Sequence, residues 1–363
     1  MYFALSENIV YRSYSLGDEE RIVDLLIRTF PNGWGKREDS LEFWRWKYLS
    51  SPWGSTIIVA LNVNQVVGVV HEIKLRAKIG SSIRECRYGD DEATDTNFRR
   101  RGVYSKLKTI QRENRVKDKV DFYHSATQNP IVSEYIKKEG GFSFPYSISY
   151  MLQVNDVKKY LLAKNRDNIV TRLGLKTLIG FNKAFSYFPI KVKPIDDFEI
   201  IGVPAFDNHV NVFWEKVEKN YEYLLEKKLN YLNWKFMRPG FDQVSVKYAL
   251  KGDELLGISM TYLRTQEGYS EGVIDQLHVL PGRLDVADAL IKDASKDLES
   301  KKASAVIFQI TRGHPYEQLV KRNGFIDASI ANKTSIYYTI LNPELDKHIL
   351  DRLPKSKIQI HYF

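Results

Sequence analysis

The sequence predicts an α+β (mixed α/β) fold in two similar domains, each with a mixed, mostly antiparallel sheet flanked by helices. Its 363 residues exceed the length at which one hydrophobic core usually stops growing. Stretches rich in β-branched residues alternate with amphipathic helical stretches, as expected when helices pack on a sheet. In addition, landmarks of the first half recur in the same order about 185 residues later.

Four short landmarks define this repeat. The aromatic stretch 43–48 recurs at 231–236, Val66-Val67-Gly68 as Leu255-Leu256-Gly257, Asn129-Pro130 as His314-Pro315, and Gly141-Phe142 as Gly324-Phe325. Any one match could arise by chance, but four in the same order indicate two copies of one domain. We therefore expect domains at 1–155 and 194–345, a basic amphipathic linker at 156–193 and a C-terminal tail at 346–363.

The first expected domain begins with a strand at 9–13 and two helices. The helix at 18–30 has acidic residues in its first turn, where they interact favourably with the helix dipole. Ser40 can cap the second helix, which runs through Trp46.

Three strands and a helix follow. Stretches at 55–61 and 65–79 are rich in β-branched residues and flank an Asn-x-Asn turn, which predicts a hairpin. A further strand is expected at 84–94. The helix from 102 to about 116 has its apolar residues on one face.

The domain is expected to close with a strand at 121–126, a helix at 130–139 and strands at 144–153. Proline is tolerated in the first turn of a helix, and the pair Gly140-Gly141 stops this one.

Composition limits the class of protein. Hydrophobic residues make up 43% and charged residues 27%, and no apolar run reaches the roughly 20 residues of a membrane span. Residues 1–12 lack the pattern of a secretory signal, so we expect a cytoplasmic protein. Cys86 is the only cysteine, which excludes an intrachain disulfide and a cysteine-based metal cluster. We expect no bound metal.

The formal net charge of +9 is concentrated in one segment. Residues 157–193 hold nine basic residues and only one acidic residue, Asp167. We expect this segment to form a helix pair whose apolar side packs between the two copies. The alternatives are peripheral contact with an anionic membrane and binding of RNA, although no nucleic-acid partner is expected. The oligomeric state stays open.

The segment 99–104, with the sequence Arg-Arg-Arg-Gly-Val-Tyr, predicts an anion cradle. It follows an acidic strand and leads into a helix, and the first amides of a helix bind phosphate readily. Taken alone, the motif is equally consistent with a basic turn that caps a surface helix.

The spacing Arg-x-x-Gly-x-Tyr resembles the pyrophosphate loop of the GNAT superfamily of N-acetyltransferases. The element order, the Asn129-Pro130 pair and the Gly141-Phe142 pair are similar to this family as well. The whole chain resembles two-copy GNAT proteins, an arrangement also seen in mycothiol synthase and Fem-type aminoacyl transferases. The resemblance implies a transferase that uses acetyl-CoA as co-substrate.

The resemblance assigns the residues that contact coenzyme A. Backbone amides of Ala93 and Thr94 hold the pantetheine arm, and Asn129 contacts it or caps the following helix. The pyrophosphate is wrapped by Arg99, Arg101, Gly102, Val103, Tyr104 and Ser105. Tyr104 departs from the family pattern, in which a small residue is commoner.

Acylation of an amine requires a group that removes its proton. Asp90 is the first candidate for this base, because the family often places its base nine residues before the motif, and Glu92 is the second. Strand alternation predicts that these two share one face while Asp91 points to the other. The alternative is a solvent-facing strand end. Tyr135 is the candidate acid that protonates the departing thiolate.

The second copy lacks the cradle. At the corresponding place the sequence is Leu-Pro-Gly-Arg-Leu-Asp, residues 280–285, and Pro281 removes a backbone donor. We expect a degenerate domain that does not bind coenzyme A, and one active site per chain.

The leading hypothesis is transfer of an acetyl group from acetyl-CoA to a primary amine on a small molecule. The acceptor would be an amino sugar or an amino-acid derivative that attacks directly within a ternary complex. The alternatives are a Fem-type aminoacyl or peptidyl transferase and an acyl-CoA-binding regulator without turnover.

Overall fold

A computed structural model describes most of the chain, which divides into two compact units. The described residues are 8–37, 39–127, 129–143, 147–185, 197–266, 268–329, 335–354 and 358–359. Unit 1 comprises 1–77, 83–144 and 334–349, and unit 2 comprises 78–82, 145–333 and 350–363. Neither unit is a continuous stretch of the sequence.

Unit 1 is built on a mixed sheet with the strand order β1-β2-β3-β4-β5-β15-β6. Strands β4 and β5 are parallel, while the β1–β2, β2–β3 and β5–β15 pairs are antiparallel. The elements in chain order are β1 (Ile9–Ser13), α1 (Glu19–Thr29), α2 (Ser40–Tyr48), β2 (Ser55–Asn62), β3 (Gln65–Ile79), β4 (Ser82–Thr94), α3 (Val103–Lys117), β5 (Phe122–Thr127), α4 (Pro130–Lys138), β6 (Phe142–Ser143) and β15 (Ser335–Ile340). The mixed sheet and the helices confirm the predicted fold class.

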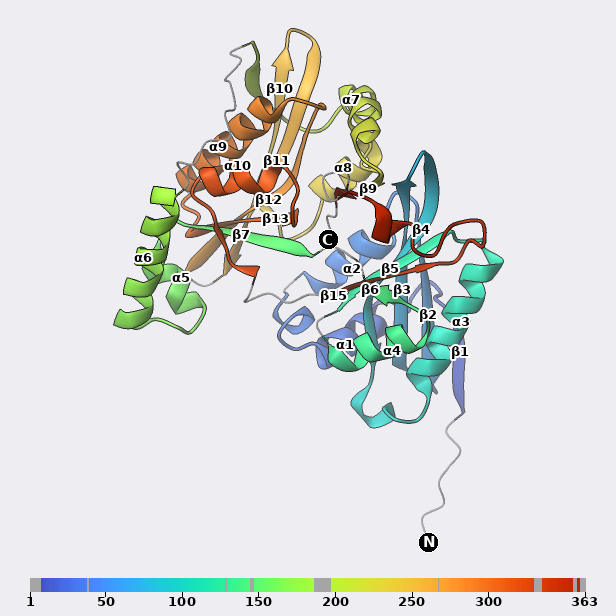
Figure 1. The fold of residues 1–363 in the computed structure, drawn as a ribbon. Coiled ribbons are helices and arrows are strands. Elements are labelled where there is room, and N and C mark those ends of the chain that lie inside the picture. The colour runs from blue at the N-terminus through green and yellow to red at the C-terminus, as the bar shows by residue number, and fades with distance from the viewer. Residues whose placement is uncertain are drawn as a thin grey trace. The chain divides into compact units, whose positions relative to one another are not determined.

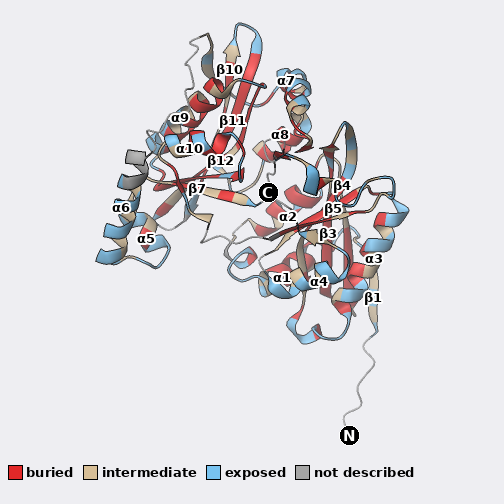
Figure 2. Cartoon of the chain, viewed as in Figure 1, coloured by how far each residue is buried: buried red, intermediate tan, exposed pale blue. Residues whose placement is uncertain are grey.

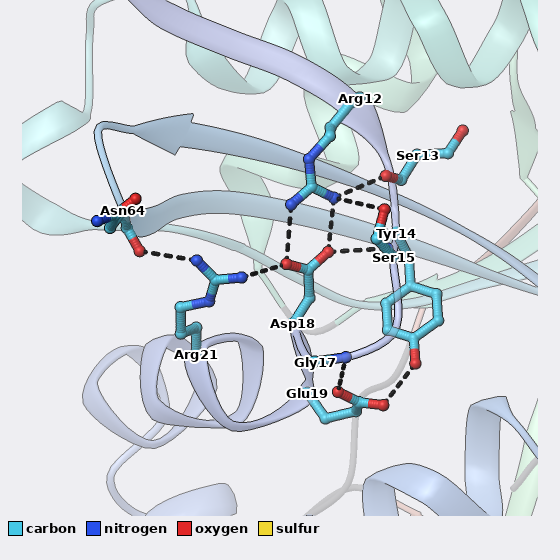
Figure 3. Close-up of polar contacts among 9 residues, drawn as sticks. All are labelled: Arg12, Ser13, Tyr14, Ser15, Gly17, Asp18, Glu19, Arg21 and Asn64. Carbon is cyan, nitrogen blue, oxygen red and sulfur yellow. Dashed lines mark hydrogen bonds and ion pairs between the residues drawn. The ribbon is translucent and has the colours of Figure 1, made fainter.

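A polar network fixes the start of α1 (Figure 3). Asp18, whose side chain is buried, accepts hydrogen bonds from both guanidinium nitrogens of Arg12 and from Arg21. The Tyr14 hydroxyl and the amide of Gly17 donate to Glu19. The acidic residues expected in this first turn thus anchor the helix to β1 as well as offsetting its dipole.

Helix α3 lies directly on the sheet at Gly68 of β3. A Cβ atom there would come within 2.8 Å of Val103 and 2.9 Å of Leu107. Both residues belong to a fully buried core cluster, so the helix start is held against the sheet. Close approach at a glycine therefore positions the loop that precedes α3.

Unit 2 has the sheet order β14-β7-β13-β12-β11-β10-β8, and its central strands are buried (Figure 2). Its elements are β7 (Ile148–Val154), α5 (Val157–Ala163), α6 (Ile169–Phe185), β8 (Glu199–Val203), α7 (His209–Val217), β9 (Tyr223–Leu225), α8 (Leu229–Phe236), β10 (Asp242–Lys251), β11 (Glu254–Gln266), β12 (Tyr269–Val279), α9 (Leu284–Ser300), β13 (Ala305–Thr311), α10 (Tyr316–Arg322), β14 (Ile326–Asp327) and β16 (Ile358–Gln359). Gly257 meets Val286 and Leu290 of α9 just as Gly68 meets α3, which matches the repeat landmark.

The closing strands of the two sheets are exchanged. Strand β7 is predicted to close the first domain, but it pairs with β13 of unit 2. Strand β15, from the end of the second copy, pairs with β5 and β6 of unit 1 (Figure 1). This corrects the placement of 144–153 in the first domain, and the reason is that the pairing partner of a strand is not encoded in its local pattern.

The basic segment contributes two helices to unit 2. Leu161 of α5 is buried, and Leu175 of α6 packs against a core cluster of β7 and β13. Residues 186–193 of the predicted linker lie outside the described residues. Of the predicted tail, β16 pairs with β9. Within the described part of the chain, no helix has the length and apolar character needed to cross a membrane.

Candidate active site at the fourth strand of unit 1

Strands β4 and β5 pair only as far as Gly89. Their parallel register runs from Cys86 opposite Phe122 to Gly89 opposite Ser125. A Cβ atom at Gly89 would lie 2.2 Å from the Tyr123 hydroxyl, so only glycine fits at this point. The acidic residues 90–92 therefore lie just beyond the end of the β4–β5 pairing.

A backbone irregularity at Asp91 sets the direction of these acids. Its φ of 47° is left-handed, which is uncommon for a residue other than glycine. The Trp44 indole donates to His71 Nε2 (3.1 Å), and this leaves His71 Nδ1 to donate to the Asp91 carbonyl (3.1 Å). Burial lowers the pKa of His71 to about 4, so the neutral ring holds the irregularity in place.

Asp90 and Asp91 share a single partner, Lys47 of α2. The Lys47 ammonium lies 2.6 Å from one oxygen of each carboxylate. The prediction that Asp90 and Glu92 share one face while Asp91 points to the other is therefore wrong, because the left-handed residue interrupts strand alternation. Tyr48 and Trp34 also donate to Asp91, at 2.6 and 3.0 Å.

The two carboxylates differ in their affinity for protons. Burial and the neighbouring charge of Asp91 raise the pKa of Asp90. Burial opposes ionisation of Asp91 too, but Lys47, Tyr48 and Trp34 lower its pKa to about 2. The Asp90 side chain is 26% exposed and that of Asp91 17%. Asp90 is thus the more basic and the more accessible member of the pair.

Glu92 is held by α3. The Tyr104 hydroxyl donates to one of its oxygens and the Lys108 ammonium to the other, both at 2.6 Å. Lys108 is buried and also contacts Gln111 and Tyr123. Tyr104, which departs from the family pattern, thus bonds to Glu92 and leaves this carboxylate with two partners.

Residues of the segment 99–105 line a cavity of about 160 Å³ at the start of α3, but Arg101, which was predicted to bind the pyrophosphate, is not among them. Gly102 has a φ of 79°, and a Cβ atom added there would meet no atom within 4 Å. The amides of the first helical turn have no acceptor inside the helix. The cavity is lined by Thr94, Phe98, Arg99, Arg100, Gly102, Val103, Tyr104 and Ser105.

Thr94 provides a second sign of a ligand at this cavity. Its hydroxyl oxygen is buried and has no hydrogen-bond partner among the described residues. Unpartnered buried hydroxyls are costly unless something binds them. Ala93, the neighbouring residue predicted to contact the ligand, is buried in the sheet.

The remaining predicted residues lie on α4. Asn129 accepts a hydrogen bond from the amide of Ile131 (3.0 Å), so it caps the helix as one of its two readings requires. The ring of Tyr135 packs edge-on against Tyr104, with 5.2 Å between centroids. Burial raises the pKa of Tyr135, so its hydroxyl keeps its proton at neutral pH.

At the corresponding place in unit 2, charged side chains of the chain pair with one another. Arg283, which precedes α9, binds Asp285 at 2.7 Å and Asp197 at 2.8 Å. Asp285 lies in the first turn of α9. A carboxylate of the chain thus lies in the first turn of this helix, where negative charge interacts favourably with the helix dipole.

Sequence reasoning missed Lys47, Tyr48 and His71 as parts of the site. A signal for Lys47 was present, because Lys235 occupies the same place in the second aromatic stretch. Lys235 lies 3.3 Å from Asp275, which is the extra residue where the β11–β12 register shifts. Both units therefore pair a lysine of the aromatic helix with an aspartate at an irregular point of a strand, β4 in unit 1 and β12 in unit 2.

Solved structures share the fold of the chain. A probable N-acyltransferase of unknown function from Enterococcus faecalis V583 aligns with a TM-score of 0.63 and 11% identity, over 92% of this chain and 73% of that one. A GCN5-related N-acetyltransferase from Anabaena variabilis ATCC 29413 aligns with a TM-score of 0.62 and 10% identity, over 92% of this chain and 73% of that one. A GCN5-related N-acetyltransferase from Kribbella flavida aligns with a TM-score of 0.56 and 11% identity, over 93% of this chain and 72% of that one. No protein-family model and no curated protein matches the chain. The chain has the fold of GCN5-related N-acetyltransferases.

Proposed function

We propose that unit 1 catalyses transfer of an acetyl group from acetyl-CoA to a primary amine on a small molecule, such as an amino sugar or an amino-acid derivative. The amine attacks directly within a ternary complex. The observation that carries the proposal is the cavity at the start of α3, which is lined by Arg99, Arg100 and Gly102. It follows closely, along the chain, a carboxylate pair at the end of the β4–β5 pairing. The shared fold supports it.

The cradle residues fit the pyrophosphate of coenzyme A. The first-turn amides of α3 and the exposed guanidinium groups of Arg99 and Arg101 supply donors and positive charge. The unpartnered hydroxyl of Thr94 supplies a further donor. The backbone amides of Ala93 and Thr94 hold the pantetheine arm. When bound, acetyl-CoA supplies a thioester as the acyl donor.

Asp90 accepts the proton that the amine loses. Its raised pKa makes it a better base than an ordinary aspartate, and Lys47 keeps the adjacent Asp91 ionised. Glu92 is the second candidate, and its bonds to Tyr104 and Lys108 make it less available. Tyr135 retains a proton that it can donate to the departing thiolate.

Unit 2 does not bind coenzyme A in this proposal. Arg283, Asp285 and Asp197 neutralise one another where a phosphate would bind. Each chain then has one active site. Unit 2 is a degenerate copy of the same domain. Its strand order, read from β8 to β14, places equivalent strands in the same positions as the order from β1 to β6 in unit 1.

The test is thiol release from acetyl-CoA in the presence of a panel of amino sugars and amino-acid derivatives. We expect the wild-type chain to acetylate at least one amine. The double variant Asp90→Asn, Glu92→Gln should still bind acetyl-CoA but release thiol at least about 100-fold more slowly.

Other outcomes identify other functions. Binding of acetyl-CoA without acetylation of any amine in a broad panel would indicate an acyl-CoA-binding regulator. Transfer from aminoacyl-tRNA without use of acetyl-CoA would indicate a Fem-type transferase. Either result would overturn the proposal.

A further inference from the structure

Helix α6 has two apolar faces. Leu175 packs with Tyr160 against the core cluster of Leu152, Ala305 and Ile307. Ile169, Val170 and Leu173 lie on another side, because residues separated by one, three or four positions share a helical face. A helix needs only one apolar face to join a core, so the second face requires its own explanation.

This second face is exposed, and we call its three residues, Ile169, Val170 and Leu173, the outer face. Their exposed fractions are 75%, 74% and 61%. Figure 2 shows α5 and α6 largely in the colour of exposed residues. Leu162 of α5 is also 51% exposed. Contiguous exposed aliphatic side chains of this kind mark an interaction surface.

The segment that carries the outer face is also rich in exposed basic residues. Lys158, Lys159, Arg166 and Lys176 are all exposed. Two other basic residues of the segment are engaged within the unit, since Arg172 pairs with Asp167 and Lys164 lies 3.9 Å from Glu271. Lys176 follows Leu173 by three positions and therefore lies close to it on the helix surface.

We propose that the outer face of α6 and the exposed basic residues of α5 and α6 bind an anionic membrane surface. Aliphatic side chains enter the boundary between headgroups and acyl chains, while lysine and arginine attract acidic headgroups. This inference is independent of the catalytic proposal. It gives the segment a role beyond packing.

Other occupants fit the surface less well. Single-stranded RNA is bound through aromatic platforms, and the described exposed apolar residues here are aliphatic. A second copy of the chain would bring the same excess of positive charge against itself, which is unfavourable. Acidic lipid satisfies both the charge and the apolar side chains.

The experiment measures sedimentation of the full chain with two kinds of vesicle, phosphatidylcholine alone and phosphatidylcholine with phosphatidylglycerol. We expect binding only to the second kind, weakened when salt rises from about 0.1 to about 0.5 M. The variant Val170→Asp, Leu173→Asp should bind at least about tenfold more weakly. The variant Lys158→Gln, Lys159→Gln, Lys176→Gln should bind the anionic vesicles more weakly and with a smaller salt dependence, because Arg166 remains.

A matched control is Val212→Asp, which alters an exposed valine of α7 in the same unit and should bind like the wild type. Circular dichroism checks that each variant is folded. The proposal is overturned if the wild type does not sediment with anionic vesicles, or if the Val170→Asp, Leu173→Asp variant binds them equally well. It is also overturned if the chain instead binds RNA alone, or forms a dimer that this variant dissociates.

Discussion

At the residue scale, Lys47 is the cation that balances the carboxylates of Asp90 and Asp91. Its ammonium is buried, and although burial opposes the charge, the two carboxylates raise the pKa of Lys47. Without Lys47, two carboxylates would be adjacent in a largely buried place with no cation between them. The lysine thus allows a carboxylate pair to exist at the end of the β4–β5 pairing.

Replacing Lys47 with methionine should destabilise the chain by about 3–5 kcal/mol at neutral pH, as removal of one buried partner usually does. The remaining carboxylates would have pKa values above those of the unfolded chain. The native state would then bind more protons, so the variant's stability should fall as pH rises. Urea unfolding at mildly acidic and neutral pH measures this.

The control is Lys137→Met, which removes an exposed ion pair with Glu134 and should leave the free energy of unfolding nearly unchanged. Equal losses in the two variants would contradict the role given to Lys47.

Asp90→Asn should lower kcat by about 100-fold or more. A base must be deprotonated, and the pKa of Asp90 is raised. The acidic limb of the wild-type kcat/KM profile should therefore lie above the usual aspartate value of about 4. That limb should vanish in Asp90→Asn and persist in Glu92→Gln. A limb that persists in Asp90→Asn would exclude this residue as the base.

The types of residue at the site could be predicted from the sequence, but the directions in which their side chains point could not. The three consecutive acids and the arginine-glycine spacing are visible in the sequence. The left-handed φ of Asp91 is not, because it depends on His71 and Trp44, which are distant in the sequence. Strand alternation therefore placed Asp91 on the wrong side.

At the scale of elements, glycine allows helices to approach the sheets. Gly68→Ala should destabilise unit 1 by about 1–3 kcal/mol, because a Cβ atom would overlap Val103 and Leu107. Gly257→Ala should act likewise in unit 2 through Val286 and Leu290. Thermal unfolding measures both.

Gly174→Ala is the matched control. This glycine lies within α6, and no atom lies within 4 Å of an added Cβ. Alanine there should stabilise slightly, since it is the better helix former. Loss of stability in the control equal to that in Gly68→Ala would contradict the packing argument.

Element bounds followed the sequence closely. Strand β3 is observed at the predicted residues, and α4 begins at the predicted Pro130. The prediction that Ser40 caps α2 is wrong, because Ser40 is the first helical residue and its hydroxyl donates to the carbonyls of Trp34 and Arg37. Caps, hairpin turns and apolar periodicity are local signals, and these elements carry them clearly.

At the scale of the whole molecule, the exchanged strands make each unit depend on both halves of the sequence. Residues 1–155 alone lack β15, which pairs with both β5 and β6. We expect that fragment to unfold or aggregate. A chain of 1–144 joined to 335–349 by a short glycine-rich linker should fold, because Ser143 already pairs antiparallel with Tyr337.

Amide hydrogen exchange compares the two shortened chains. Stable, cooperative protection of amides in the 1–155 fragment would contradict the claim that unit 1 needs β15 from the end of the chain. The repeat was visible in the sequence, but the exchange was not, because either closing strand has a pattern that suits either sheet.

Under the proposed function, the segment 99–105 binds acetyl-CoA and its counterpart in unit 2 does not. Calorimetric titration of acetyl-CoA into the full chain tests this most directly, with Gly102→Val and Gly282→Val as a matched pair. Both glycines have a left-handed φ, 79° and 82°, and open space at the Cβ position. We predict that the wild type and Gly282→Val bind one acetyl-CoA per chain and that Gly102→Val does not bind it. No binding by the wild type, or undiminished binding by Gly102→Val, would contradict the account.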